Sequence, residues 1–305
     1  MIIDKVAYLK VIHERQEKIK DRLFFLNNGL SIYSNNTDLD LSPGCKSCKS
    51  GTWWCLYVGY KCNLDCWYCP QGKKEVKENK IDHPNAMQHL WIDDIKIALK
   101  SVEKGTINGI SYSGGEPFLY LEKIEEMASF INENFGDSIY QWIYTNGLLV
   151  TEDKIKKLKD LNIKEIRFHI GASDCNPQVI EKLKYSSKIL RTTIETPSLP
   201  IIKDFLINND GFKKIIDYGV TQLNLSELYF VQNNEIIDKY TKYIYSSMFR
   251  GTHESPIISR LITYDIIEYA LENNLKIIIN DCSHESRDAQ ILTRELNKKR
   301  LYNMW

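Results

Sequence analysis

Three cysteines at C-x3-C-x2-C spacing are the residues of this chain best suited to chemistry. Cys62, Cys66 and Cys69 lie in one short run that ends at Pro70. Each thiolate can ligate one iron of an iron–sulfur cube, which leaves the fourth iron without a protein ligand. An open coordination position is what separates a catalytic metal site from a structural one. The spacing therefore predicts a metal centre at which a small molecule can bind and react.

Strand-like and helix-like segments alternate from the cysteine run onward. The predicted strands are 52–59, 109–113, 139–144, 165–172, 190–195 and 222–228. The predicted helices between them are 92–103, 121–135, 152–161, 178–189 and 203–218. Connections of this length imply parallel strands joined by right-handed crossovers. Six strands are too few to close a barrel of eight, so the pattern predicts an α/β fold, a partial (β/α)6 TIM-like barrel.

The two ends of the chain extend this core. Residues 4–28 have helical periodicity and predict one amphipathic helix, and 30–50 have the composition of a loop. The last third predicts helices at 235–246, 259–273 and 287–300 and an apolar strand at 275–280. We divide the chain into an N-terminal helix and cysteine-bearing loop (1–50), a barrel core (51–230) and a C-terminal extension packed on the barrel (231–305).

Composition narrows the class of protein. The formal net charge is +0, which gives no electrostatic case for binding nucleic acid or an anionic membrane. No apolar run approaches the roughly 20 residues of a membrane-spanning helix, and the first residues lack the apolar core of a signal peptide. We expect a cytoplasmic protein. Eight cysteines in such a chain favour metal or redox chemistry over disulfides.

A zinc ribbon is the alternative interpretation of the cysteines. Cys45-x2-Cys48 and Cys66-x2-Cys69 have ribbon spacing, with 17 residues between the pairs. The protein would then be a structural or electron-carrying metalloprotein and not an enzyme. This interpretation leaves Cys55 and Cys62 without a role, and it predicts nothing further along the chain.

A glycine-bearing turn, Gly114-Gly115-Glu116-Pro117, follows the second predicted strand. Glycine lets a backbone approach a ligand closely because it has no Cβ. The cysteine run together with this turn resembles the radical S-adenosylmethionine (radical SAM) superfamily, in which an aromatic residue, here Tyr68, also precedes the third cysteine. The resemblance covers roughly residues 52 to 230. The run from Gly44 to Pro70 also resembles a group related to pyruvate formate-lyase activating enzymes.

The resemblance implies an enzyme that holds a [4Fe–4S] cluster through Cys62, Cys66 and Cys69 and binds SAM at the open iron. In this superfamily, one-electron reduction of SAM gives methionine and a 5′-deoxyadenosyl radical, which removes a hydrogen atom from a substrate. A donor such as flavodoxin or ferredoxin would supply the electron. A peptide is one substrate to expect, and a small metabolite or a glycyl-radical enzyme awaiting activation are the others.

The resemblance also implies roles for residues around the cluster. Gly114 and Gly115 would accept the SAM ammonium through their carbonyl groups, with Glu116 supporting that contact, and Tyr68 would pack near the adenine. Thr145 and Asn146 would face the SAM cavity.

Polar residues at the ends of the fourth and fifth predicted strands are further candidates, because ligand sites in parallel α/β folds lie there. His169 and Ser173 would contact the SAM carboxylate or ribose, and Glu195 would hold the ribose hydroxyls. The alternatives are a structural histidine for His169 and a solvated strand end for Glu195.

Four other cysteines suggest a second metal centre. We hypothesise an auxiliary iron–sulfur cluster held by Cys45, Cys48, Cys55 and Cys282, the last delivered by a late parallel strand. The alternatives are a zinc site on Cys45 and Cys48, or a Cys55 buried as a small hydrophobe. Cys175, just past the fourth strand, is either a thiol that donates a hydrogen atom to a substrate radical or an ordinary loop residue.

Overall fold

A computed structural model describes residues 4–69, 92–101, 106–229, 244–247 and 253–296. Its main sheet contains β1 (Leu23–Leu26), β2 (Ser31–Asn35), β3 (Trp53–Tyr57), β4 (Gly109–Ser113), β5 (Tyr140–Thr145), β6 (Ile163–Phe168), β7 (Arg191–Pro197), β8 (Gln222–Ser226) and β11 (Ile278–Cys282). The helices are α1 (Lys5–Lys18), α2 (Pro43–Lys49), α4 (Ile92–Ser101), α5 (Leu121–Phe135), α6 (Glu152–Asp160), α7 (Pro177–Ser186), α8 (Pro200–Lys203), α9 (Gly211–Asp217), α11 (Ile257–Glu272) and α12 (His284–Leu296). β9 (Ile244–Ser247) and β10 (His253–Pro256) form a separate antiparallel pair.

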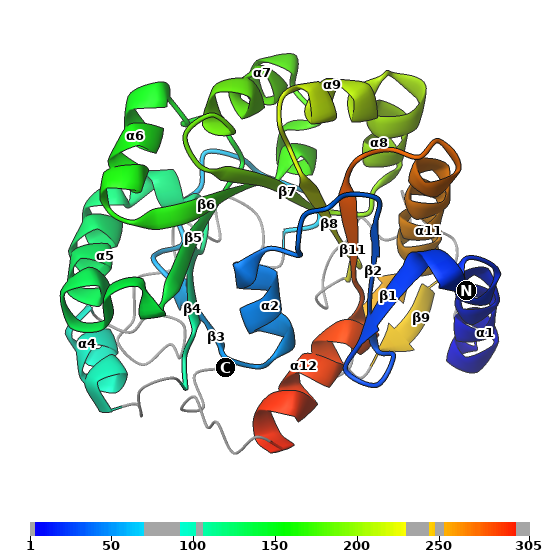
Figure 1. Ribbon diagram of the computed structural model, residues 1–305, viewed down its shortest axis with the longest axis horizontal. Coiled ribbons are helices and arrows are strands. Elements are labelled where there is room, and N and C mark those ends of the chain that lie inside the picture. Colours follow the sequence, from blue (N-terminus) through cyan, green and yellow to red (C-terminus); the bar gives the residue numbers. More distant parts are fainter. Residues whose placement is uncertain (1–3, 70–91, 102–105, 230–243, 248–252, 297–305) are drawn as a thin grey trace.

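The main sheet is open and mostly parallel. Its strands follow the order β1-β2-β11-β8-β7-β6-β5-β4-β3. All neighbours from β3 through β8 to β11 are parallel, and β2 pairs antiparallel with both β11 and β1. Figure 1 shows the sheet curving around a central space with helices on its outer side. The predicted partial barrel is confirmed, and β11, β2 and β1 extend it beyond the six predicted strands.

Alternate side chains of each strand face either the helices or the enclosed space. In β3, Trp54 and Leu56 belong to the hydrophobic core, whereas Trp53, Cys55 and Tyr57 line an inner cavity. Several strands bury polar side chains, namely Glu165, Arg167, Thr193, Gln222, Asn224 and Asn280. Because buried polar groups need hydrogen-bond partners, the inside of this barrel is organised by polar contacts.

The predicted helix over 4–28 is wrong beyond residue 18. α1 ends at Lys18, and Leu23–Leu26 instead forms β1, paired with β2. Asn27, Asn28 and Gly29 have φ values of 51°, 55° and 87°, so they form a hairpin turn and do not end a helix. The apolar, aromatic run before them favours a strand, and such a left-handed turn joins two antiparallel strands.

The predicted loop over 30–50 is also wrong, because it contains β2 and α2. Ser42 caps α2 by accepting a hydrogen bond from the backbone nitrogen of Cys45, and Pro43 occupies the first turn. Both are standard signals of a helix start. Figure 1 shows α2 inside the curve of the sheet, so the first cysteine pair lies within the barrel.

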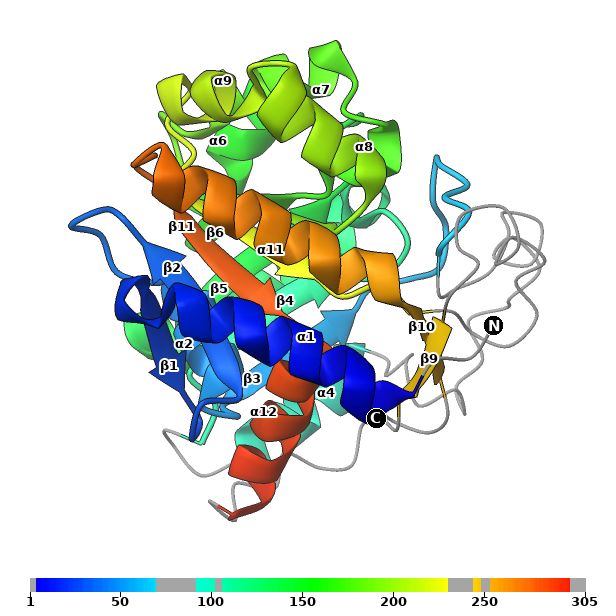
Figure 2. The ribbon, with the colours of Figure 1, turned by 90° about the vertical axis from the view of Figure 1, so that its right-hand side faces the viewer.

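The C-terminal region covers one edge of the barrel. α11 and α12 begin two and three residues before the helices predicted at 259–273 and 287–300. The helix predicted at 235–246 lies outside the described residues up to 243, and 244–246 belong to β9. Figure 2 shows α1 lying along α11, where Arg15 contacts Glu268 at 2.6 Å and Asp265 at 2.8 Å.

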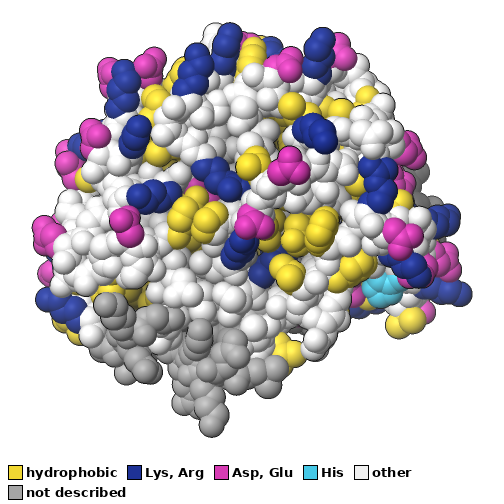
Figure 3. Space-filling model, in the orientation of Figure 1, with side chains coloured by type: hydrophobic (Ala, Val, Ile, Leu, Met, Phe, Trp, Pro, Cys, Tyr) yellow, Lys and Arg dark blue, Asp and Glu magenta, His cyan; other side chains and the backbone are white. Residues whose placement is uncertain are grey.

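The surface charges mix both signs. Figure 3 shows lysine and arginine side chains interspersed with aspartate and glutamate on the face that it presents. Among the described helices, none combines the length and apolarity that a membrane span requires.

Candidate active site

A cavity of about 430 Å³ lies at the carboxyl ends of the parallel strands and gathers most of the predicted site residues. The predicted residues that line it are Cys55, Cys62, Cys66, Tyr68, Cys69, Gly114, Gly115, Glu116, Thr145, Asn146, His169 and Glu195. Ser173, Cys175, Cys45, Cys48 and Cys282 do not line it. Because this end of a parallel sheet is where ligand sites form, the cavity is the candidate active site.

The glycine turn packs directly against the chain that leads into the cysteine loop. The backbone nitrogen of Gly115 donates to Gly59 O, and that of Glu116 donates to Lys61 O, each at 2.8 Å. A Cβ added to Gly115 would lie 2.1 Å from Lys61 O, and one on Gly114, whose φ is 139°, would lie 2.4 Å from Gly59 O. Both positions therefore require glycine for packing, apart from any ligand contact.

Glu116 ties this turn to the end of β5. It is 1% exposed, and its carboxylate accepts hydrogen bonds from Thr145 Oγ1 and Asn146 N, both at 2.8 Å, and from Phe118 N at 3.1 Å. Burial raises the pKa of Glu116, and these three donors oppose that rise. Glu116 thus acts as a brace within the protein that holds two walls of the cavity together.

The ends of β5 and β6 hold the cysteine loop across the cavity. Asn146 Nδ2 donates to Asn63 Oδ1 at 2.7 Å and lies 3.9 Å from Cys62 Sγ. Cys66 Sγ lies 3.8 Å from the carbonyl oxygen of Ala172. The three thiols of the motif therefore line one wall of the cavity, close to the glycine turn.

The part of the chain that the structure describes offers no site for a single metal ion. Among the described residues, no three His, Cys, Asp or Glu side chains gather closely enough for one metal ion. Thiolates on one zinc lie only about 4 Å apart, because each Zn–S bond is about 2.3 Å long. In an iron–sulfur cube each cysteine binds its own iron, which places the sulfurs farther apart. The zinc-ribbon interpretation gains no support from this arrangement.

Tyr68 and His169 form a pair at the cavity wall. Tyr68 Oη lies 3.2 Å from His169 Nε2, and His169 Nδ1 lies 3.1 Å from Thr196 Oγ1. Burial lowers the pKa of His169 to about 4, so the imidazole is neutral at pH 7. Both ring nitrogens already have protein partners, which makes His169 a residue that positions Tyr68.

The low pKa of His169 predicts acid sensitivity. Between pH 6.5 and about 4 the unfolded chain binds a proton that the folded state does not, so stability falls as pH drops through this window. At about 1.4 kcal/mol per pH unit, wild type should lose about 2 kcal/mol from this group between pH 7 and pH 5. Denaturant unfolding of wild type and His169→Gln at both pH values measures the difference. Equal pH dependence in the two proteins would contradict this assignment.

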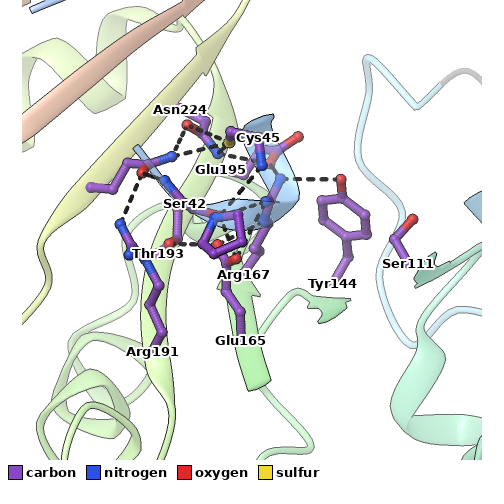
Figure 4. Close-up of polar contacts among 12 residues, drawn as sticks. Ser42, Cys45, Ser111, Tyr144, Glu165, Arg167, Arg191, Thr193, Glu195 and Asn224 are labelled. Atoms are coloured by element: carbon purple, nitrogen blue, oxygen red, sulfur yellow. Dashed lines mark hydrogen bonds and ion pairs between the residues drawn. The ribbon is translucent and has the colours of Figure 1, made fainter. Parts of the chain in front are cut away.

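Buried charges lie deeper in the barrel (Figure 4). Arg167 is flanked by Glu165 at 2.9 Å and Glu195 at 2.8 Å. Burial alone would raise the pKa of Glu165, but Arg167, Ser42 and Thr193 together hold it below its ordinary value. Glu195 lines the cavity and also accepts from Asn224 at 3.0 Å, so it is an ion-paired group at the boundary between the cavity and the barrel interior.

The second cysteine group separates into two parts. Cys45 on α2 and Cys282 at the end of β11 lie beside the buried amide of Asn280, and Cys48 lies one turn after Cys45, whereas Cys55 lines the cavity. Sequence analysis did not identify the amide residues Gln222, Asn224 and Asn280 beside these thiols. The only local sign of these amides in the sequence was the presence of polar residues within otherwise apolar strands.

Two predicted site residues lie away from the cavity lining. Cys175 is 9% exposed and packs in the hydrophobic core, which does not support its role as a hydrogen-atom donor. Ser173 donates its hydroxyl to Ile170 O at 3.2 Å within a short 3-10 turn, which does not support a contact with SAM.

Comparison with known families bears directly on this site. Residues 56–192 match the family model of the radical SAM superfamily. The match covers a little under half of the chain. This match confirms the predicted radical SAM resemblance for that segment, and a radical SAM domain implies SAM and a [4Fe–4S] cluster as its cofactors. The matched segment contains Cys62, Cys66 and Cys69 and the turn at Gly114.

The relatives that are similar to this chain carry different descriptions. A Methanocaldococcus jannaschii protein described as a glycyl-radical enzyme activating enzyme is 27% identical over 202 residues, covering 64% of this chain and 52% of that protein. A protein of Methanococcus maripaludis described as a GTP 3′,8-cyclase is 30% identical over 174 residues, covering 57% and 48%. The chain thus spans about half the length of these relatives.

The structure of Streptococcus suis SuiB with bound S-adenosylmethionine is 16% identical with a TM-score of 0.52, covering 76% of this chain and 50% of SuiB. Another SuiB structure covers 93% of this chain and 56% of its own, with a TM-score of 0.51 at 15% identity. At these identities the likeness shows a shared fold.

Proposed function

We propose that this protein cleaves SAM reductively and uses the resulting radical to remove a hydrogen atom from a substrate. The supporting observation is that one cavity gathers the thiols of Cys62, Cys66 and Cys69 with the glycine turn at Gly114 and Gly115. The same cavity holds the braced pair Tyr68 and His169, and its volume lies within the usual range for small-ligand sites.

Each group has a distinct task in this proposal. Cys62, Cys66 and Cys69 hold the cluster, which when bound and reduced supplies the one electron that splits SAM into methionine and a 5′-deoxyadenosyl radical. The radical takes a hydrogen atom and leaves as 5′-deoxyadenosine, so each turnover consumes one external electron and leaves one substrate radical. The carbonyls of Gly114 and Gly115 accept the SAM ammonium, and Tyr68 packs against the adenine. The protein's contribution is orientation and exclusion of water.

The substrate enters, in this proposal, at the end of the cavity lined by Glu227, Tyr229 and Arg287. Charged groups of both signs there suit a zwitterionic or mixed-charge molecule such as a peptide. Two other substrates should be tested beside a peptide. One is a protein glycine, because one relative is described as a glycyl-radical enzyme activating enzyme. The other is a nucleotide, because another relative is described as a GTP 3′,8-cyclase.

A second iron–sulfur centre on the remaining cysteines completes the proposal. Six of the eight cysteines lie between Cys45 and Cys69, and all eight are free thiols. Flavodoxin or ferredoxin is the proposed source of electrons.

The decisive test is turnover of SAM without any substrate. Anaerobically reconstituted protein with dithionite and SAM should form 5′-deoxyadenosine and methionine in equal amounts, and omitting dithionite should stop both. Protein that contains one zinc and no acid-labile sulfide, and that forms no 5′-deoxyadenosine, would overturn the proposal. Peptide, nucleotide and glycyl-radical enzyme are then compared by their acceleration of 5′-deoxyadenosine formation.

A further inference from the structure

Three cysteines that do not line the cavity come from α2 and from the end of β11, two elements far apart in the sequence. Cys45 and Cys48 lie one turn apart on α2, and Cys282 ends β11, opposite Ser226 of β8. Asn280 Nδ2 lies 4.0 Å from Cys45 Sγ and 3.1 Å from Cys282 Sγ, so these two sulfurs are at most about 7 Å apart. Cys48 is half-buried on the same helix as Cys45.

Amide groups of the surrounding strands direct N–H donors at these sulfurs. Cys45 Sγ lies 3.1 Å from Gln222 Nε2 and 3.4 Å from Asn224 Nδ2. The orientation of Asn224 is set because its Oδ1 accepts from Gln222 at 2.8 Å and from Asn280 at 3.2 Å. Figure 4 shows Cys45 and Asn224 side by side within this network. A buried thiol needs only apolar neighbours, whereas a thiolate or cluster sulfur needs donors such as these.

Two further buried polar groups lie on the same two elements as these cysteines. Lys49 is the last residue of α2, next to Cys48, and is only 6% exposed. A buried ammonium is costly unless negative charge lies nearby. Asn280 Oδ1 is also buried and has no hydrogen-bond partner among the described residues, beside the same thiols.

Cys55 does not belong to this group. It lines the cavity with Trp53 and Tyr57 on the inner side of β3. Burial is the main cause of the raised pKa of Tyr57 and of Tyr144, and the charge of nearby Cys55 adds a smaller rise to each. The four-cysteine set expected from the sequence therefore separates into three interior thiols and one thiol of the cavity wall.

We infer that the second centre is an iron–sulfur cluster held by three cysteines, Cys45, Cys48 and Cys282, with Gln222, Asn224 and Asn280 as positioning amides. This inference deepens the proposed function by naming the ligands of its second centre. Three thiolates on a cube leave one iron to take an oxygen or nitrogen donor. Glu195, which lines the cavity and contacts Asn224, stands between these thiols and the cavity.

The test isolates this centre from the first one. A variant carrying Cys62→Ala, Cys66→Ala and Cys69→Ala is reconstituted anaerobically, and it should retain about four irons and matching sulfide per chain. Adding Cys45→Ala, Cys48→Ala or Cys282→Ala should reduce iron to background, whereas adding Cys55→Ala or the core variant Cys175→Ala should not. Because the triple variant does not depend on SAM cleavage, failure of this inference and failure of the proposed function are separable.

Controls address folding and the open iron. In a chain with the first motif intact, Cys282→Ala should keep about four irons, which shows that the barrel still folds. Cyanide added to the reduced triple variant should change its EPR spectrum if one iron lacks a cysteine. Equal iron loss on Cys55→Ala and Cys282→Ala would establish four cysteine ligands instead of three. An EPR spectrum that cyanide does not change would overturn the inference that one iron lacks a cysteine ligand.

The role of the amides is tested separately, through the midpoint potential of the cluster. In the triple variant, Asn280→Leu should lower the cluster's midpoint potential while retaining its iron, because hydrogen bonds to the sulfurs favour the reduced, more negative state. The exposed Asn209→Leu serves as the matched control and should leave the potential unchanged. A potential that does not move in Asn280→Leu would remove the amides from the proposal.

Discussion

Cys66→Ala is expected to abolish formation of 5′-deoxyadenosine and to remove about four irons per chain. Each thiolate of the motif binds one iron, and the cluster no longer binds stably to the protein when one of its three ligands is missing. Cys66 lies half-buried at the cavity, with its sulfur 3.8 Å from Ala172 O, and truncation to alanine removes a single sulfur atom, so the fold should stay intact. Iron and sulfide analysis together with product quantification after reduction by dithionite measures both effects.

The matched control lies in the same loop. Asp65 is exposed beside Cys66 and cannot act as a thiolate ligand, so Asp65→Ala should keep both the iron and the activity. Far-UV circular dichroism should be the same for both variants and wild type. Wild-type amounts of 5′-deoxyadenosine from Cys66→Ala would be incompatible with the cluster assignment and with the proposed function.

The repeating core of the fold was predictable because its signals are local. Each parallel strand between β3 and β8 is a short apolar run followed by a helix of suitable length, and this pattern implies the crossover topology. The N-terminal region was mispredicted because β1 is stabilised by pairing with β2. β2 in turn pairs with β11, almost 250 residues away in the sequence. Such long-range pairing leaves only a weak trace in the sequence.

The first half of the site was predictable for a similar reason. Cys62, Cys66, Cys69 and the turn at Gly114 are contiguous motifs whose spacing carries the chemistry. The interior network is different, because Arg167 meets Glu195 only through the neighbouring strands β6 and β7. Which cysteine joins which centre likewise depends on the position of α2 inside the barrel. Period-two polar residues in buried strands were the one local hint of this interior.

Glu116→Ala is expected to destabilise the protein by about 3 kcal/mol and to lower SAM cleavage sharply. The substitution leaves three buried donors, on Thr145, Asn146 and Phe118, without their acceptor, and each such loss costs about 1–3 kcal/mol. Asn146 also contacts Asn63 of the cysteine loop, so loosening it disturbs the loop that holds the cluster. Anaerobic denaturant unfolding gives the stability loss as a lower midpoint at unchanged slope.

Two further variants test how much each hydrogen bond of Glu116 contributes to stability. Thr145→Val removes one hydrogen bond to Glu116 and the hydrogen bond that Gly147 N donates to the same hydroxyl at 3.0 Å, so it should cost about 2 kcal/mol, less than Glu116→Ala. Glu116→Gln keeps one acceptor oxygen but turns an amide N–H toward the backbone of Asn146 or Phe118, so its stability should lie between those of wild type and Glu116→Ala. If Glu116→Ala unfolds at the wild-type midpoint, the carboxylate does not brace the cavity. A normal midpoint with lost SAM cleavage would instead assign Glu116 a direct contact with the cofactor.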